Sequence, residues 1–251
     1  MGRNCNEVFL GTRRQQLIAA VLTIVMLAIP AMTGYAAANV SGLVSNKAAS
    51  TYCQSCTSNP EVVEYAKKYF GLSAEVITGE EEYNYLSLLK SIDGFSDLKE
   101  RLSKYRVVKV NPINYVYISG AFKEANNTLL YAVINGNNNE ILMLKTVKYD
   151  GGDSVFVKDF LNDGVIKENK ISLAEMARAK EEHEKEINAF MNKYDSRIEL
   201  SAINWEYWVC QFAGELACAM GCLVFTPNAV LIGICDRMCK FFWGNGLCSK
   251  F

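Results

Sequence analysis

The chain has 251 residues, half of them hydrophobic, and a formal net charge of −1 from 26 basic and 27 acidic side chains. A near-neutral chain without a basic stripe lacks the electrostatic signature of nucleic-acid binding, so we expect no nucleic-acid partner. One histidine and no glycine-rich phosphate loop leave few residues for a catalytic triad, a histidine metal site or a nucleotide site. We therefore expect no enzyme activity, no metal and no cofactor.

The first 38 residues have the three-part pattern of an export signal. Three arginines precede an uncharged apolar stretch from 17 to 32, and Ala36 and Ala38 stand at the −3 and −1 positions of a cut after Ala38. This pattern predicts a signal peptide over 1–38, removed by signal peptidase, and a secreted protein. An uncleaved membrane anchor is the alternative, although the stretch is short against the roughly 20 residues of a membrane span. Two consecutive arginines leave the choice between general and twin-arginine export open.

The nine cysteines of the chain are unevenly placed. Cleavage after Ala38 removes Cys5 and leaves eight, an even number that fits complete disulfide pairing in an exported protein. Cys53 and Cys56 have the spacing of a redox motif, but no βαβ pattern surrounds them. A local disulfide is therefore expected there, with a thiol oxidoreductase site as the alternative.

Residues 39–200 are expected to form an α+β domain, an antiparallel sheet with flanking helices. Helical spacing of apolar residues predicts a helix over 60–70 and another that starts at a Thr78–Glu81 capping box. The period then changes to alternation, with an Asn-Gly turn over 135–139. The predicted strands are 107–110, 115–118, 129–134, 140–149 and 155–160.

A second capping box, Ser172–Glu175, opens a long helix that is predicted to end near Tyr194. The charged segment 181–186 is assigned to the solvent side of this helix. His183 lies in that segment, with no cysteine or second histidine nearby. It is therefore predicted to be solvated, and neither a ligand nor a base.

Residues 201–251 are expected to form a small disulfide-stapled, antiparallel α-helical hairpin. This segment holds six cysteines, and two pairs of them are spaced four residues apart, which places each pair on one face of a helix. Antiparallel helices would bring these cysteines together in nested pairs around a turn at Pro227-Asn228. The predicted bridges are Cys218–Cys239, Cys222–Cys235 and Cys210–Cys248.

Two other interpretations of this segment stay open. The charge-free run 216–235 is long enough to span a membrane as one helix, although Pro227 lies in its centre. Twin cysteine pairs can also bind zinc as thiolates, although an oxidising environment favours disulfides.

The cysteines at 210, 218 and 222 are separated by seven and then three residues, with Ala-Gly between the first two and Gly before the third. The segment closes on Asn245-Gly-Leu-Cys248. In these features it resembles the halocin-type peptide bacteriocins, cysteine-rich antimicrobials made as the C-terminal part of a longer exported precursor. The resemblance implies an N-terminal domain that can act as an immunity protein, and a protease that frees the C-terminal peptide.

The sequence thus favours an exported bacteriocin-like precursor, a defence protein whose C-terminal module acts on a bacterial membrane or surface target. Its own N-terminal domain would be the protective partner, with a cut expected within 195–204. Membrane contact is expected for Trp205, Trp208 and Trp243, because tryptophan favours the lipid–water interface. The alternative is an exported structural or interaction protein whose hairpin only stabilises or anchors it.

Overall fold

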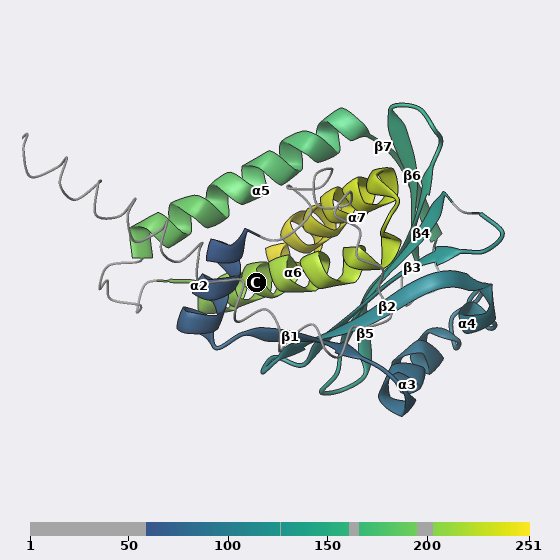
Figure 1. The fold of residues 1–251 in the computed structure, drawn as a ribbon, viewed down its shortest axis with the longest axis horizontal. Coiled ribbons are helices and arrows are strands. Elements are labelled where there is room, and N and C mark those ends of the chain that lie inside the picture. The colour runs from purple at the N-terminus through teal and green to yellow at the C-terminus, as the bar shows by residue number, and fades with distance from the viewer. Residues whose placement is uncertain (1–58, 126, 161–165, 195–202) are drawn as a thin grey trace, which may run out of the picture. The chain divides into compact units, whose positions relative to one another are not determined.

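The computed structural model describes residues 59–125, 127–160, 166–194 and 203–251. All of them fall in one compact unit, which extends from Ala48 to Phe251. The expected fold class is confirmed: a seven-stranded antiparallel sheet with flanking helices is followed by two C-terminal helices joined by three cysteine pairs. Figure 1 shows the sheet with the helices beside it. The signal peptide, its cleavage site at Ala36 and Ala38, and Cys53 and Cys56 lie outside the described residues.

The sheet is a meander in which each strand pairs with the next along the chain. Its strands are β1 (Ser73–Ile77), β2 (Leu102–Asn111), β3 (Tyr115–Phe122), β4 (Thr128–Asn135), β5 (Glu140–Tyr149), β6 (Ser154–Phe160) and β7 (Ile166–Ser172). The five predicted strands correspond to β2 to β6. The two edge strands, β1 and β7, were not predicted, because each buries one residue, Ile77 and Ile171, and so lacks the alternation that identifies a strand.

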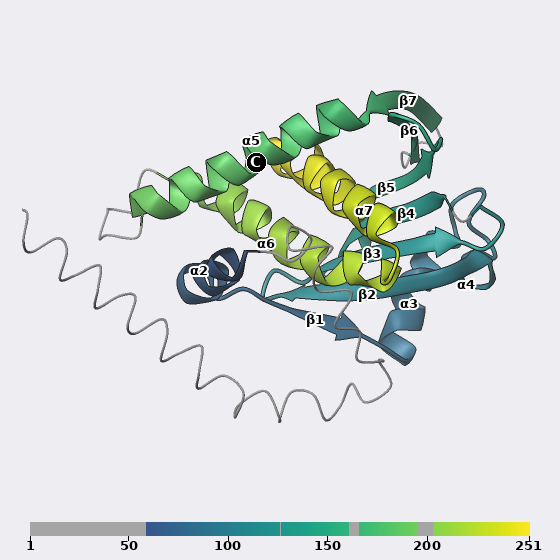
Figure 2. The same ribbon diagram turned by 45° about the horizontal axis from the view of Figure 1, so that its top comes forward.

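Side chains of the strands alternate between two hydrophobic cores. In β3, Tyr117 lies in one core, while Val116 and Ile118 lie in the other. The second core is completed by α3 (Glu80–Leu89) and α4 (Leu98–Arg101). The first, larger core is completed by helices on the opposite face, which Figure 2 shows from another side: α2 (Pro60–Phe70), α5 (Leu173–Tyr194), α6 (Trp205–Cys222) and α7 (Ala229–Phe242).

Local sequence explains most helix ends. The Asn59 side chain caps α2 by accepting a hydrogen bond from the Glu61 N–H. At the start of α5, the Glu175 N–H donates to Ser172 Oγ at 3.1 Å, in agreement with the predicted cap. The predicted cap at Thr78 is wrong: α3 begins one residue later, and its N-cap is Gly79, whose φ of 78° favours glycine.

The C-terminal hairpin has its turn where the sequence predicts it. The charge-free run 216–235 is not one helix, because α6 ends at Cys222 and a short 3₁₀ segment, Leu223–Phe225, follows. Asn228 then caps α7 by accepting from the Leu231 N–H at 3.1 Å. After α7 the chain closes with two short helical turns, Trp243–Leu247 and Cys248–Lys250.

The hairpin packs into the same core as the sheet. Met238 and Phe242 of α7 belong to the cluster of buried side chains that also contains Tyr117 and Tyr131 of the sheet. The cysteine content predicts a domain boundary near residue 201. The hydrophobic core extends across that position, because it contains side chains from both parts of the chain.

Candidate functional site

Three disulfides staple the hairpin in the nested order predicted from the sequence. Cys218–Cys239 and Cys222–Cys235 join α6 to α7, with Cα atoms 5.7 and 5.6 Å apart. Cys210–Cys248 joins the first part of α6 to the C-terminal turn, with a Cα–Cα distance of 5.6 Å. Sulfurs bridged in this way cannot act as thiolate ligands of zinc, the alternative that the sequence left open.

These bridges consume all six cysteines of the segment 205–251. No cysteine of the hairpin is left to form a bridge with the rest of the chain. All disulfides of the hairpin therefore join residues within it. Its covalent connection to the sheet domain is the peptide backbone that precedes Trp205.

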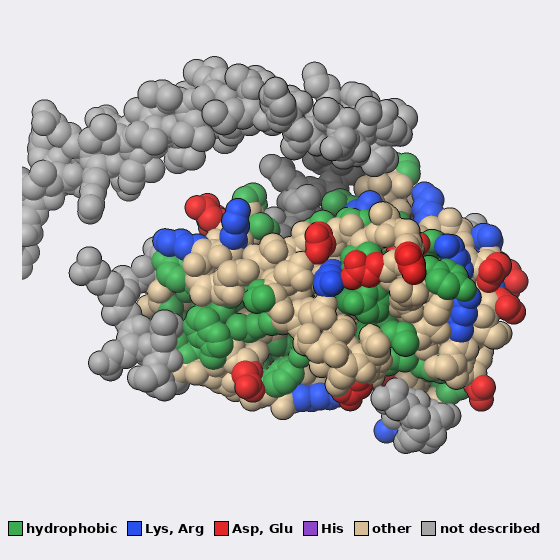
Figure 3. Space-filling view, turned by 90° about the horizontal axis from the view of Figure 1, so that it is seen from below, with side chains coloured by type: hydrophobic (Ala, Val, Ile, Leu, Met, Phe, Trp, Pro, Cys, Tyr) green, Lys and Arg blue, Asp and Glu red, His purple; other side chains and the backbone are tan. Residues whose placement is uncertain are grey.

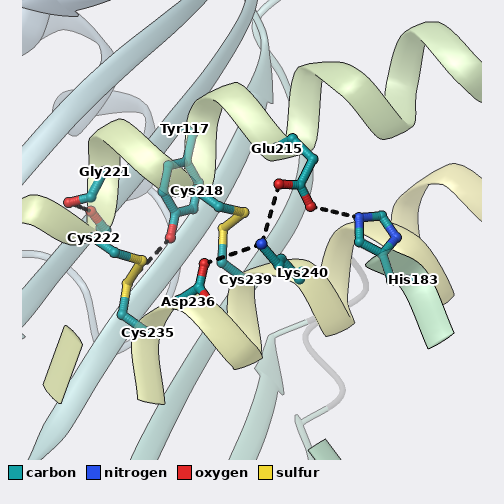
Figure 4. The surroundings of a disulfide bond; sticks show 11 residues. Tyr117, His183, Glu215, Cys218, Gly221, Cys222, Cys235, Asp236, Cys239 and Lys240 are labelled. Carbon is teal, nitrogen blue, oxygen red and sulfur yellow. Dashed lines mark hydrogen bonds and ion pairs between the residues drawn. A yellow bond between two sulfur atoms is a disulfide. The ribbon is translucent and has the colours of Figure 1, made fainter. Parts of the chain in front are cut away.

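The hairpin approaches the sheet closely at Gly221 of α6. A Cβ atom on this glycine would lie 2.3 Å from Cε1 of Tyr117, so any larger residue would push α6 away from β3. Ser119 Oγ donates to the Gly221 carbonyl at 3.1 Å, and Arg106 donates to the Met220 carbonyl at 2.7 Å. The Tyr117 hydroxyl also lies 3.9 Å from Cys235 Sγ, and Figure 4 shows the two side chains next to each other.

The three tryptophans predicted to contact a membrane differ in exposure. Trp243 is 1% exposed and packs against Gly214 and the Tyr115 ring. Trp208 is half-buried and stacks on Phe190 of α5, with ring centroids 3.8 Å apart, while Trp205 is 39% exposed. In the docked state, therefore, Trp243 cannot reach lipid, and the predicted contact requires the hairpin to leave the sheet.

A buried network of charged groups connects α5 to the hairpin (Figure 4). His183 Nε2 lies 2.9 Å from Glu215 Oε1, and Lys180 Nζ lies 2.7 Å from Asp236 Oδ2. Lys240 Nζ joins the two carboxylates, at 3.2 Å from Glu215 Oε2 and 3.6 Å from Asp236 Oδ1. Because unpaired buried charges are costly, this network fixes how α5 sits on the hairpin.

The predicted solvation of His183 is wrong, because its side chain is 8% exposed. The buried residues of α5 are Met176, His183, Ile187 and Phe190, whose spacings of seven, four and three place them on one helix face. That spacing was present in the sequence and would have identified the face. The charged neighbours of His183 obscured it.

Opposing effects set the pKa values of the central pair. Burial alone would raise the pKa of the Glu215 carboxyl, but the hydrogen bond from His183 and the charge of Lys240 lower it below its usual value. Burial alone would lower the pKa of Lys240, but Glu215, Asp236 and Glu184 raise it. Both groups are therefore charged at neutral pH, and Glu215 and Lys240 form a true ion pair.

Comparison with known proteins identifies no relative. No protein-family model, curated protein or solved structure matches the chain. The resemblance to halocin-type bacteriocins therefore remains an expectation from the sequence.

Neither a metal centre nor a membrane span is established in the described part of the chain. Within these residues, no three histidine, cysteine, aspartate or glutamate side chains gather to hold a metal ion. One helical segment, Trp205–Phe225, is long and apolar enough to cross a membrane, but 67% of its most apolar window is buried inside the fold. The helices of the stapled hairpin and the charged interface with α5 are thus the candidate site.

Proposed function

We propose that the chain is the exported precursor of a bacteriocin-like peptide. Residues 205–251 would be toxic to bacterial membranes, and residues 39–204 would keep them inactive and protect the producing cell. The observation that carries this proposal is the closed disulfide framework of the hairpin. A single backbone cut within 195–204 would end its covalent connection to the sheet domain while leaving all three bridges intact.

The hairpin surface that the sheet domain covers is apolar, which favours lipid binding once the hairpin is free. Phe212, Phe242 and Trp243 are each at most 3% exposed, and Phe212 and Phe242 contact aromatic rings of α2 and the sheet, Tyr65 and Tyr131. Burying a side chain of this size contributes about 1.5–3 kcal/mol. A hairpin that leaves the sheet would lose these contributions in water and could recover them in a bilayer.

Two polar atoms where the hairpin meets the sheet support a separable contact. Trp243 Nε1 and the Tyr131 hydroxyl are buried and have no hydrogen-bond partner among the described residues. A permanent core seldom leaves such groups unpaired, because each costs about 1–3 kcal/mol. Separation of the hairpin would let the Tyr131 hydroxyl find a partner in water and the Trp243 N–H find one at the lipid–water interface.

Apolar burial, rather than charge, would drive membrane binding. Residues 205–251 carry three acidic and three basic side chains, so their net charge is zero: Glu206, Glu215 and Asp236 against Arg237, Lys240 and Lys250. Attraction to anionic lipid is then weak, and affinity depends on buried apolar area.

The start of the hairpin is accessible from solvent. Figure 3 shows hydrophobic side chains exposed on the side of the molecule that carries α2 and β1. The exposed apolar residues include Val63 of α2, Val76 of β1 and Trp205, the first residue of α6. Trp205 directly follows the segment in which we expect the cut, so a protease acting there would find the hairpin side of the cut exposed.

The test uses the full mature chain, in which residues 195–202 are replaced by a site-specific protease sequence. The oxidised protein is cut, and growth inhibition of related bacteria and dye leakage from lipid vesicles are measured for the uncut chain, the cut chain and the purified 205–251 fragment. We expect the fragment to be active, the uncut chain to be inactive, and added residues 39–204 to suppress the fragment. A fragment with intact disulfides that neither inhibits growth nor causes leakage would favour the alternative, an exported structural or interaction protein.

A further inference from the structure

The hairpin presents different chemistry to the sheet and to α5, while Phe212 also packs on α2. Towards the sheet it presents glycine, sulfur and aromatic rings. Towards α5 it presents charged groups together with the Trp208 ring. Because both faces are covered in the precursor, the difference becomes important when the hairpin is free.

The sheet-covered face of the hairpin is apolar. Phe242 packs edge-on against Tyr131, with ring centroids 5.5 Å apart, and Trp243 lies 6.3 Å from the Tyr115 ring. Gly221 and Cys235 meet Tyr117 on the same face. Burial, with a further contribution from the charge of Asp236, raises the pKa of the Tyr117 and Tyr131 hydroxyls. The ion pairs of Asp236 in the described part of the chain are nevertheless with Lys180 and Lys240 and not with the strands.

The α5-covered face of the hairpin carries the charged groups, beside the Trp208 ring that stacks on Phe190. Glu215 contacts His183, Asp236 contacts Lys180, and Lys240 contacts Glu184 at 3.3 Å. When α5 leaves, the two carboxylates share one cation, Lys240, and these three groups carry a net charge of −1. Such a group cannot enter hydrocarbon cheaply, and it must find water.

Resting on the proposed function, we infer that the freed hairpin lies in the membrane interface with its sheet-covered face in the lipid and its α5-covered face towards water. The bilayer then takes the place of the sheet, since both offer an apolar surface. Water takes the place of α5, since both satisfy the carboxylates of Glu215 and Asp236. This orientation is that of an amphipathic element lying in the plane of the interface.

The lengths of the helices favour this orientation over a spanning one. α7 has 14 residues, which gives a length of about 21 Å at 1.5 Å per residue, against a hydrocarbon core of about 30 Å. In a spanning hairpin, Asp236 and Lys240 in the second half of α7 and Glu215 in the middle of α6 would lie within the hydrocarbon. An interfacial hairpin avoids that cost.

Two tryptophans on different faces make the orientation measurable. Trp243 belongs to the sheet-covered face, and Trp208 stacks on Phe190 of α5. Two full-length chains with the engineered cut site each keep one of them: Trp205→Phe with Trp208→Phe, and Trp205→Phe with Trp243→Phe. Each is oxidised and cut, and its purified 205–251 fragment is added to phosphatidylcholine–phosphatidylglycerol vesicles, with either brominated acyl chains as quencher or iodide in the water. Dye leakage is recorded on the same samples.

We expect brominated lipid to quench most of the tryptophan fluorescence of the chain that keeps Trp243, and iodide to quench little of it. For the chain that keeps Trp208 we expect the reverse. Leakage with Trp243 quenched by iodide and not by lipid would overturn the orientation and leave the proposed function standing. So would leakage with both tryptophans quenched by brominated lipid, which would indicate a spanning hairpin. Absence of leakage from the intact, oxidised fragment would overturn the proposed function and the orientation with it. If Trp243→Phe prevents folding, Trp243→Tyr replaces it in that chain, so that the two tryptophans are still compared.

Discussion

His183 of α5 and Glu215 of α6 form a hydrogen bond of 2.9 Å between Nε2 and Oε1, with side chains that are 8% and 3% exposed. The two residues lie on opposite sides of the segment 195–204, in which we expect the precursor to be cut. The single histidine of the chain therefore holds the hairpin to the domain that we propose keeps it inactive. Replacing one of these residues tests this contact without touching the disulfides.

Substituting His183→Leu should destabilise the precursor. It removes the hydrogen bond to Glu215 and leaves that buried carboxylate with Lys240, so we expect a loss of about 1–3 kcal/mol in the free energy of unfolding. The measurement is urea unfolding of the oxidised chain followed by circular dichroism. Lys185→Gln is the matched control on the same helix, because its pair with Glu181 is exposed to solvent, and we expect no measurable change. Equal effects of the two substitutions would contradict the buried contact.

The stability that Glu215 contributes should depend on pH. Its pKa is lower in the folded chain than the ordinary 4.5, so its contribution is present above pH about 4.5 and is lost as the pH falls through the folded value. Wild type should therefore exceed Glu215→Gln in unfolding free energy at neutral pH, and the difference should shrink as the pH falls below about 4.5. Glu206→Gln, an exposed site on the same helix, is the control. A difference that grows on acidification would show that the ion pairs do not stabilise the interface.

Glycine substitutions test the close approach of α6 to the sheet. Gly221→Ala puts a methyl group 2.3 Å from Tyr117 Cε1, and the rearrangement should cost about 1–3 kcal/mol. Gly233→Ala in α7 meets nothing within 4 Å, and by favouring the helix it should stabilise the chain by about 0.5–1 kcal/mol. Thermal and urea unfolding of both variants measure these two changes in the free energy of unfolding, which we expect to have opposite signs. A neutral Gly221→Ala would indicate that the hairpin does not dock on β3.

The nested disulfides predict a specific peptide map. Proteolysis of the non-reduced chain should yield fragments that join Cys210 to Cys248, Cys218 to Cys239 and Cys222 to Cys235. Replacing both cysteines of one bridge by alanine should cost about 2–4 kcal/mol, measured by urea unfolding with the other two bridges intact. A fragment joining Cys218 to Cys222 would be incompatible with the antiparallel hairpin.

Much of the fold could be predicted from local sequence. The helix over 60–70, the five central strands and the cap at Ser172 follow from periodicity and from capping chemistry, which act within a few residues. The cysteine pairing also follows from spacing, because two helical pairs on either side of a turn have one nested arrangement. Edge strands β1 and β7 could not be predicted, because a strand paired on one side and largely exposed carries little hydrophobic pattern.

The sequence by itself determined that a stapled hairpin follows a sheet domain, whereas the tertiary structure decided what covers that hairpin. The burial of Trp243 and of His183 depends on partners far along the chain, such as Tyr115 and Glu215. The same is true of the contact between Tyr117 and Cys235, which are 118 residues apart. Periodicity shows that a helix has an apolar or a charged face, but it does not name the surface that face will meet. That choice depends on how the sheet, α5 and the hairpin fill one common core.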